Sequence, residues 1–197
     1  EDRIFAEEDG LRSPISEGSV WVIDPIDGTN NFVTQKEDFA VMVAYFEDGI
    51  GQFGLIYDVM RDHLFYGGGE FPVYRNEVEL TPFVDQPLEN FLIASNVGML
   101  EKNDWGMADL GMDSLGIRVY GSAGISFSKI LSGGILAYFS YIWPWDYAAA
   151  AIMGEQLGYT VLNLNGDKPN YQSVEPIMMV PKVKLTKIQT YLKKGRS

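Results

Sequence analysis

Cysteine is absent from this chain of 197 residues, and histidine occurs once. Without cysteine there can be no disulfide framework, thiolate zinc site, iron–sulfur cluster or cysteine nucleophile. His63 is the one candidate base for a Ser-His-Asp triad, and no Gly-x-Ser-x-Gly elbow accompanies it. We therefore expect His63 to be a half-exposed strand residue without a catalytic role.

Long apolar runs and positive charge are also scarce. No run of eighteen apolar residues occurs, so we expect no membrane partner. The 15 Lys and Arg against 27 Asp and Glu give a net charge of −12, which argues against nucleic acid as a partner. No signal peptide is recognisable, and we expect a cytoplasmic protein. Length and composition predict one domain, 1–197, with approximate halves 1–95 and 96–197.

Hydrophobic patterning predicts a mixed α/β fold. The first half suggests an antiparallel meander followed by a weak helix near 103–112, and the second half alternates strands with helices. The predicted strands are 19–23, 39–46, 53–58, 63–66, 91–94, 116–120, 135–141, 160–163 and 177–180. The predicted helices are 122–132 with Ser122 as N-cap, 146–157 with Asp146 as N-cap, and a last one with Leu185, Ile188 and Leu192 on one face and Gly195 as its stop.

Residues 49–54 match the pattern G-x-G-x-x-G, which in dinucleotide-binding proteins opens a helix. Here the following residues, 55–59, have the pattern of a strand. We therefore interpret the segment as a hairpin turn whose glycines lie where two chain segments pass closely.

The segment WVIDPIDGT has a different character, because a buried strand ends on two carboxylates three residues apart. Asp24 and Asp27 are hard oxygen ligands that suit Mg²⁺, and the Ile26 carbonyl between them is a further one. Taken alone, the same residues also fit an ordinary turn, with Asp27 as a helix N-cap.

The residues after Asp27 suit a phosphate group. Gly28 lets the backbone come close to a ligand, and a short helix beginning there would point the N–H groups of Gly28, Thr29 and Asn30 at an anion. Haloacid-dehalogenase-type phosphatases share the Asp-Gly-Thr ending, but their spacing places the nucleophile at Pro25, which cannot attack phosphorus.

Together these segments resemble the inositol monophosphatase family of magnesium-dependent phosphatases. The central signature, DPIDGT at 24–29, matches without departure. Three further segments are similar to family motifs in order and spacing: IFAEE at 4–8, with Ala6 in place of glycine, GSA at 121–123 and WDYAA at 145–149. The resemblance implies the family's layered αβαβα sandwich, with the N-terminal helices apparently missing here, and a homodimer.

The resemblance also implies a site with two or three Mg²⁺ ions. Glu8, Asp24 and the Ile26 carbonyl would hold the first ion, and Asp24, Asp27 and Asp146 the second. Glu8 and Thr29 would position the attacking water, and the amides of Gly28 and Thr29 would bind phosphate. The groups implied to touch the alcohol part of the substrate are Gly121, Ser122, Ala123 and Asp146.

The expected activity is hydrolysis of a small polyol or sugar phosphate, inositol monophosphate first, with lithium inhibition as a family trait. Ser140 stands where inositol-specific members carry an acid, and Leu136 where the family often has aspartate. Fructose 1,6-bisphosphate and 3′-phosphoadenosine 5′-phosphate are therefore alternative substrates. From another class, a non-catalytic metal- and phosphate-binding regulatory dimer stays open, as does an acidic scaffold without a ligand.

Overall fold

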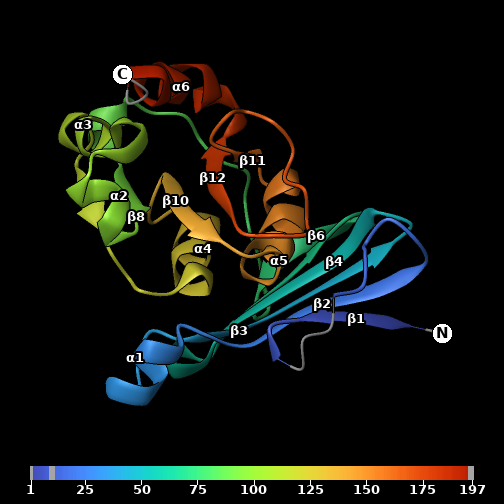
Figure 1. Ribbon diagram of the computed structural model, residues 1–197. Coiled ribbons are helices and arrows are strands. Elements are labelled where there is room, and N and C mark those ends of the chain that lie inside the picture. Colours follow the sequence, from blue (N-terminus) through green and yellow to red (C-terminus); the bar gives the residue numbers. More distant parts are fainter. Residues whose placement is uncertain (1, 9–11, 195–197) are drawn as a thin grey trace.

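The computed structural model describes residues 2–8 and 12–194, and their strands form two sheets (Figure 1). The seven-stranded sheet has the order β1 (Arg3–Ala6), β2 (Ser19–Asp27), β3 (Ala40–Glu47), β4 (Ile50–Asp58), β5 (His63–Gly68), β6 (Phe71–Arg75) and β7 (Val78–Glu79). The five-stranded sheet has the order β11 (Tyr159–Asn163), β12 (Glu175–Pro181), β10 (Ala137–Ile142), β8 (Leu92–Ser95) and β9 (Gly116–Arg118).

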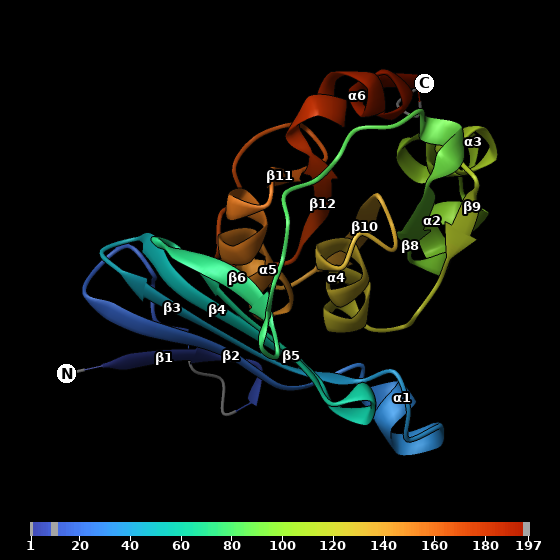
Figure 2. The ribbon, with the colours of Figure 1, turned by 180° about the vertical axis from the view of Figure 1, so that it is seen from behind.

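Helices separate and cover these sheets, as the two opposite views show (Figures 1 and 2). Between the sheets lie α4 (Ala123–Leu131) and α5 (Pro144–Gln156), and α5 packs against β2 to β5 on one side and β11 on the other. Against the outer face of the five-stranded sheet lie α2 (Val97–Glu101), α3 (Met107–Asp113) and α6 (Leu185–Lys194). The remaining helix, α1 (Thr29–Thr34), directly follows β2.

This arrangement confirms the layered α/β prediction. The described residues form four layers in the order sheet, helices, sheet, helices, which are four of the five layers of an αβαβα sandwich. Two hydrophobic clusters fill the interfaces, one around α4 and α5 and one beneath α2, α3 and α6. Within residues 2–8 and 12–194 no helix is long and apolar enough to span a membrane.

A local irregularity in β2 explains how two aspartates three residues apart come to face the interior. Val20, Val22 and Asp24 are buried in strict alternation, as a period of two requires. The pairing with β3 then shifts register between Asp24 and Asp27. A bulge of this kind re-aims the next side chain. Asp27 is therefore buried beside Asp24 instead of pointing to the opposite face.

Most predicted elements are confirmed, with differences at their ends. Ser122 is the N-cap of α4, and its hydroxyl accepts the Ile125 N–H at 3.1 Å. The helix predicted from Asp146 begins earlier, at Pro144. The weak helix predicted near 103–112 corresponds to a 3₁₀ turn at Asp104–Gly106 followed by α3, and α2 precedes it. Strands β1, β6 and β7 were not predicted, and the predicted stop at Gly195 lies outside the described residues.

The glycines of the rejected dinucleotide pattern do lie where chain segments pass closely. Residues 49–54 form the β3–β4 turn and the start of β4, so no helix opens there. A Cβ atom added to Gly54 would lie 2.5 Å from the carbonyl oxygen of Ala149 in α5. One added to Gly51 would lie 2.5 Å from the Ile152 side chain. These glycines let α5 approach the seven-stranded sheet.

Candidate metal centre

Three aspartates from two distant parts of the chain converge between the sheets. Asp24 and Asp27 come from β2, and Asp146 comes from the first turn of α5. One carboxylate oxygen from each lies within 4.8 Å of those of the other two. Asp24 and Asp27 are only 1% and 6% exposed, so the cluster is largely removed from water.

Asp27 is held by the N-terminus of α4. The Ser122 hydroxyl and the Gly124 N–H, at 2.8 Å, donate to Oδ2 of Asp27, and the Ala123 N–H donates to Oδ1 at 3.0 Å. A helix N-terminus carries unpaired N–H groups and a partial positive charge, both of which favour an anion. Burial nevertheless raises the pKa of Asp27, although these three hydrogen bonds act in the opposite direction.

Asp24 has fewer compensating donors. The Ile26 N–H donates to its Oδ1 at 3.0 Å. Burial, and then the charges of Asp27 and Asp146, raise the pKa of Asp24 from 3.8 to about 9. A buried carboxylate beside two others resists ionisation for both reasons.

Asp146 occupies the third position of α5, so its predicted role as N-cap is wrong. Trp143 is the N-cap residue, and its N–H donates to Oδ2 of Asp146 at 2.7 Å. Pro144 takes the first helical position, where its fixed φ and missing N–H cost nothing. Burial, followed by the charge of Asp27, raises the pKa of Asp146 to about 7.

The donor set fits a hard divalent cation. Mg²⁺ prefers carboxylate and carbonyl oxygens, and this centre presents three carboxylates close together in a largely buried place. Burial and the neighbouring carboxylates raise the pKa values of Asp24 and Asp146. A bound cation would lower these pKa values, since a nearby positive charge favours the ionised carboxylate.

A fourth carboxylate, that of Glu7, acts electrostatically on the cluster. Strand β1 pairs in parallel with β2, with Ala6 opposite Ile23, and the Glu7 N–H donates to the Ile23 carbonyl at 3.3 Å. Glu7 thus stands level with Asp24 on the neighbouring strand. Its negative charge raises the pKa of Asp24, Asp27 and Asp146 alike.

Glu8, the residue chosen from the sequence, follows one position later, and both glutamates are exposed. The register with β2 distinguishes them, because Ala6 lies opposite Ile23 and the next residue, Glu7, therefore lies opposite Asp24. The signal was present in the sequence, but it required recognition of residues 3–6 as a strand parallel to β2.

Helix α1 places the phosphate-site candidates next to the cluster. Gly28 is its N-cap, with φ +82, a left-handed conformation that favours glycine. A Cβ atom at Gly28 would also lie 2.9 Å from that of Ser122. Thr29 and Asn30 are exposed in the first turn. The Thr29 hydroxyl donates to the Ile26 carbonyl at 3.1 Å, so these two predicted site groups are in direct contact.

The predicted alcohol-binding residues lie beside Asp27. Ser122 and Ala123 are buried and hydrogen-bonded to it, whereas Gly121 is exposed. Buried Asn31 joins this segment to α1, because its side-chain amide donates to the Tyr120 carbonyl at 2.7 Å and to the Asp38 carbonyl at 2.9 Å. Sequence reasoning missed Gly124 and Asn31. The one hint in the sequence is that Gly124 lies two residues after Ser122, the predicted N-cap.

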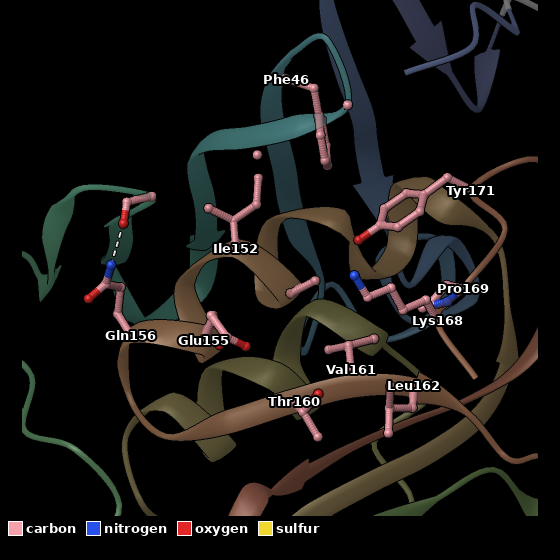
Figure 3. Close-up of a pocket in the computed structure, with 14 residues that line it drawn as sticks. Phe46, Ile152, Glu155, Gln156, Thr160, Val161, Leu162, Lys168, Pro169 and Tyr171 are labelled. Atoms are coloured by element: carbon pink, nitrogen blue, oxygen red, sulfur yellow. Dashed lines mark hydrogen bonds between the residues drawn. The ribbon is translucent and has the colours of Figure 1, made fainter. Parts of the chain in front are cut away.

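A cavity of about 410 Å³ lies at the other end of α5 (Figure 3). Ile152, Glu155 and Gln156 of α5 line it together with Lys168 and Tyr171. The Gln156 side-chain amide donates to the Gly69 carbonyl. Glu155 lies nine residues after Asp146, about 13 Å along the helix axis. This cavity is therefore separate from the aspartate cluster.

Comparison with known proteins connects this centre to one family. The sequence model of the inositol monophosphatase family matches residues 1–195. Inositol-1-monophosphatase of Bacillus subtilis is 37% identical over 171 residues, covering 84% of this chain and 64% of that protein. Nus factor SuhB of Salmonella typhimurium is 27% identical over 169 residues, covering 83% of this chain and 63% of that protein.

A solved structure of the same family has the same fold. The crystal structure of inositol monophosphatase-II from Staphylococcus aureus superimposes with a TM-score of 0.91 at 31% identity, over 98% of this chain and 74% of that one. The chain thus spans less than two thirds of the length of either curated relative. On the match over residues 1–195, the chain belongs to the inositol monophosphatase family.

Proposed function

We propose that this chain carries the metal centre of a Mg²⁺-dependent phosphomonoesterase that hydrolyses a small polyol or sugar phosphate. The observation that carries the proposal is the convergence of Asp24, Asp27 and Asp146 within 4.8 Å. No ordinary structural role explains two buried carboxylates and a half-buried third at one point, since such a cluster repels itself.

The proposed ligands follow the placement of the donors. Asp24, the Ile26 carbonyl and a glutamate of the β1 end would hold one Mg²⁺, and Asp24, Asp27 and Asp146 would hold a second, with a third ion optional. For the glutamate we propose Glu7 in place of Glu8, because its charge raises the pKa of all three aspartates. When bound, Mg²⁺ offsets the negative charge of the site and acts as a Lewis acid toward phosphoryl oxygens.

The chain's own groups then bind and orient the substrate. The first N–H groups of α1, from Gly28, Thr29 and Asn30, are aimed at the phosphate by the helix start. The Thr29 hydroxyl, together with Glu7, orients the attacking water. Its hydrogen bond to the Ile26 carbonyl holds it beside a group that would be a ligand of the first ion.

The leaving alcohol departs on the side of α4 and α5. We propose that Gly121 meets the alcohol part of the substrate and that Ser122 and Ala123, which hold Asp27, form the wall behind it. Asp146, at the start of α5, lies on the same side, near the leaving oxygen.

Inositol monophosphate is the first candidate substrate. Ser140 and Leu136 are both buried, and Ser140 accepts a hydrogen bond from Asn96 at 3.1 Å. Neither position offers a carboxylate to sugar hydroxyls. Fructose 1,6-bisphosphate and 3′-phosphoadenosine 5′-phosphate therefore stay as alternatives. We further propose a cytoplasmic homodimer that is inhibited by lithium.

A regulatory role is the candidate from another class, and the similarity to a protein named Nus factor SuhB favours keeping it. Such a protein would bind metal and phosphate without turnover. Its prediction differs from ours in one measurement, because Mg²⁺ would stabilise the fold while no phosphate is released.

The test is phosphate release from the four compounds inositol 1-phosphate, fructose 1,6-bisphosphate, 3′-phosphoadenosine 5′-phosphate and glycerol phosphate. We expect release that requires Mg²⁺ and is lost in Asp24→Asn, and the order of rates would identify the substrate class. Thermal stabilisation by Mg²⁺ without release from any compound would overturn the enzyme and support the regulatory role.

A further inference from the structure

Arg12 ties the end of β1 to the chain segment that returns past it. Its guanidinium donates to the Ala6 carbonyl, and its backbone forms an antiparallel bridge with Phe5. Glu7 directly follows Phe5 and Ala6, the two residues that Arg12 contacts in this way. The position of Glu7 at the end of β1 is therefore fixed on one side by pairing with β2 and on the other by Arg12.

The same guanidinium packs on the first turn of α5. Its central carbon lies 4.5 Å from the centre of the Trp145 ring and 5.5 Å from those of Trp143 and Phe5. The two tryptophan rings stack with centroids 4.8 Å apart and an angle of 9° between them. A planar cation suits such ring faces better than an ammonium group does.

This turn is the one that positions Asp146. Trp143 is the N-cap of α5 and its N–H donates to Oδ2 of Asp146 at 2.7 Å, while Trp145 precedes Asp146 directly. Arg12 thus contacts both supports of the cluster, the strand end before Glu7 and the turn before Asp146. These two carboxylates lie 139 positions apart in the sequence and repel each other.

We propose that Arg12 is a positioning residue that holds Glu7 and Asp146 at the separation the metal ions need, acting through the Trp143–Trp145 stack. The inference rests on the proposed function, because it assigns Arg12 a role only through the metal centre. Arg12 is not proposed to touch the substrate.

The test is a titration of the wild-type chain and of Arg12→Ala with MgCl₂. Binding is measured by the shift in melting temperature and by the change in tryptophan fluorescence. Loss of a residue that orients metal ligands costs about 10–100-fold in metal affinity. We expect the Mg²⁺ concentration at half-saturation to rise by about tenfold or more in Arg12→Ala. Lys187→Ala is the matched control, since it removes the 5.5 Å cation–ring contact with Tyr191 on α6.

A double-mutant cycle with Trp143→Leu tests the route of the effect. If Arg12 acts through the tryptophan stack, the two changes in half-saturation are not additive, since they remove one shared contact. Additive effects overturn this route. If Arg12 is merely structural, Arg12→Ala lowers the melting temperature but leaves the Mg²⁺ concentration at half-saturation within twofold of the wild type. That result overturns the role of Arg12 and leaves the proposed function standing. A wild-type chain that does not respond to Mg²⁺ overturns the proposed function as well.

Discussion

At the scale of single residues, Asp24 illustrates the electrostatic penalty of the cluster. It is 1% exposed, and its pKa rises from 3.8 to about 9 through burial and the charges of Asp27 and Asp146. A carboxyl whose pKa is higher in the folded chain binds more protons there than in the unfolded chain. Its contribution to stability is present at low pH and is lost as the pH rises through the folded pKa.

The first prediction concerns pH in the absence of divalent cations. The free energy of unfolding, measured by urea denaturation in EDTA, should fall as the pH rises from 5 to 8. The fall for one proton is at most about 1.4 kcal/mol per pH unit. Asp24→Asn removes the titrating group, so its curve should be flatter and its stability at pH 8 higher by on the order of 1 kcal/mol. Parallel curves for the two proteins would contradict the assignment.

Asn31 shows how one buried amide joins two parts of the site. Its donations to the Asp38 and Tyr120 carbonyls connect α1 to the segment before α4. Asn31→Ala should lower the free energy of unfolding by about 1–3 kcal/mol, because two partly buried acceptors lose their donor. Asn30→Ala, at the exposed neighbouring position, is the control for denaturation measurements and should change stability by less than about 0.5 kcal/mol.

At the scale of elements, the N-terminus of α4 decides the environment of Asp27. The helix approaches closely because Gly124 lacks a side chain. An added Cβ atom there would lie 2.8 Å from that of Ala40, 3.0 Å from Oδ2 of Asp27 and 3.1 Å from the Met42 sulfur. Contacts under 3.0 Å force the helix and sheet apart.

Gly124→Ala should therefore destabilise the protein although alanine is the better helix former. We expect a loss of about 1–3 kcal/mol in the free energy of unfolding, from overpacking, against a gain of about 1 kcal/mol from helix propensity. Gly98→Ala in α2 is the matched control, since a Cβ atom added there would lie 3.6 Å from Oδ1 of Asn96, an ordinary contact distance. It should be neutral or stabilising in the same urea titration, and an equal loss in both variants would contradict this explanation.

At the scale of the whole molecule, the site depends on how α5 lies across the seven-stranded sheet. Asp24 and Asp27 belong to the sheet, while Asp146 belongs to the helix layer. The distance between these layers is set partly by Gly54, whose added Cβ would lie 2.5 Å from the Ala149 carbonyl oxygen. Backbone atoms on both sides leave no flexible group to move aside.

Gly54→Ala should move α5 away from the sheet and so disturb the cluster from a distance. We expect the free energy of unfolding to fall by about 1–3 kcal/mol and the Mg²⁺ concentration at half-saturation of the thermal shift to rise. Gly98→Ala again serves as the control. An unchanged half-saturation in a destabilised Gly54→Ala would show that the cluster tolerates movement between the layers.

Sequence alone determined the elements whose causes are local. The apolar alternation ending on Asp24 predicts β2. Ser122 predicts the start of α4, because its hydroxyl accepts a hydrogen bond from the N–H group three residues later. The motif around residues 24–29 predicts the family, which the match over residues 1–195 confirms. The rejection of the dinucleotide pattern was also correct, since a strand follows residue 54.

Only the tertiary structure decided what depends on register and layer packing. It placed Glu7 level with Asp24 through parallel pairing, moved Asp146 from an N-cap to the third position of α5, and committed Ser122 to Asp27. Glu7 and Asp24 are 17 positions apart in the sequence, and Asp27 and Ser122 are 95 positions apart. Local propensities act within a few residues. The meeting of carboxylates from a sheet edge, a bulge and a helix start follows instead from how the whole molecule packs.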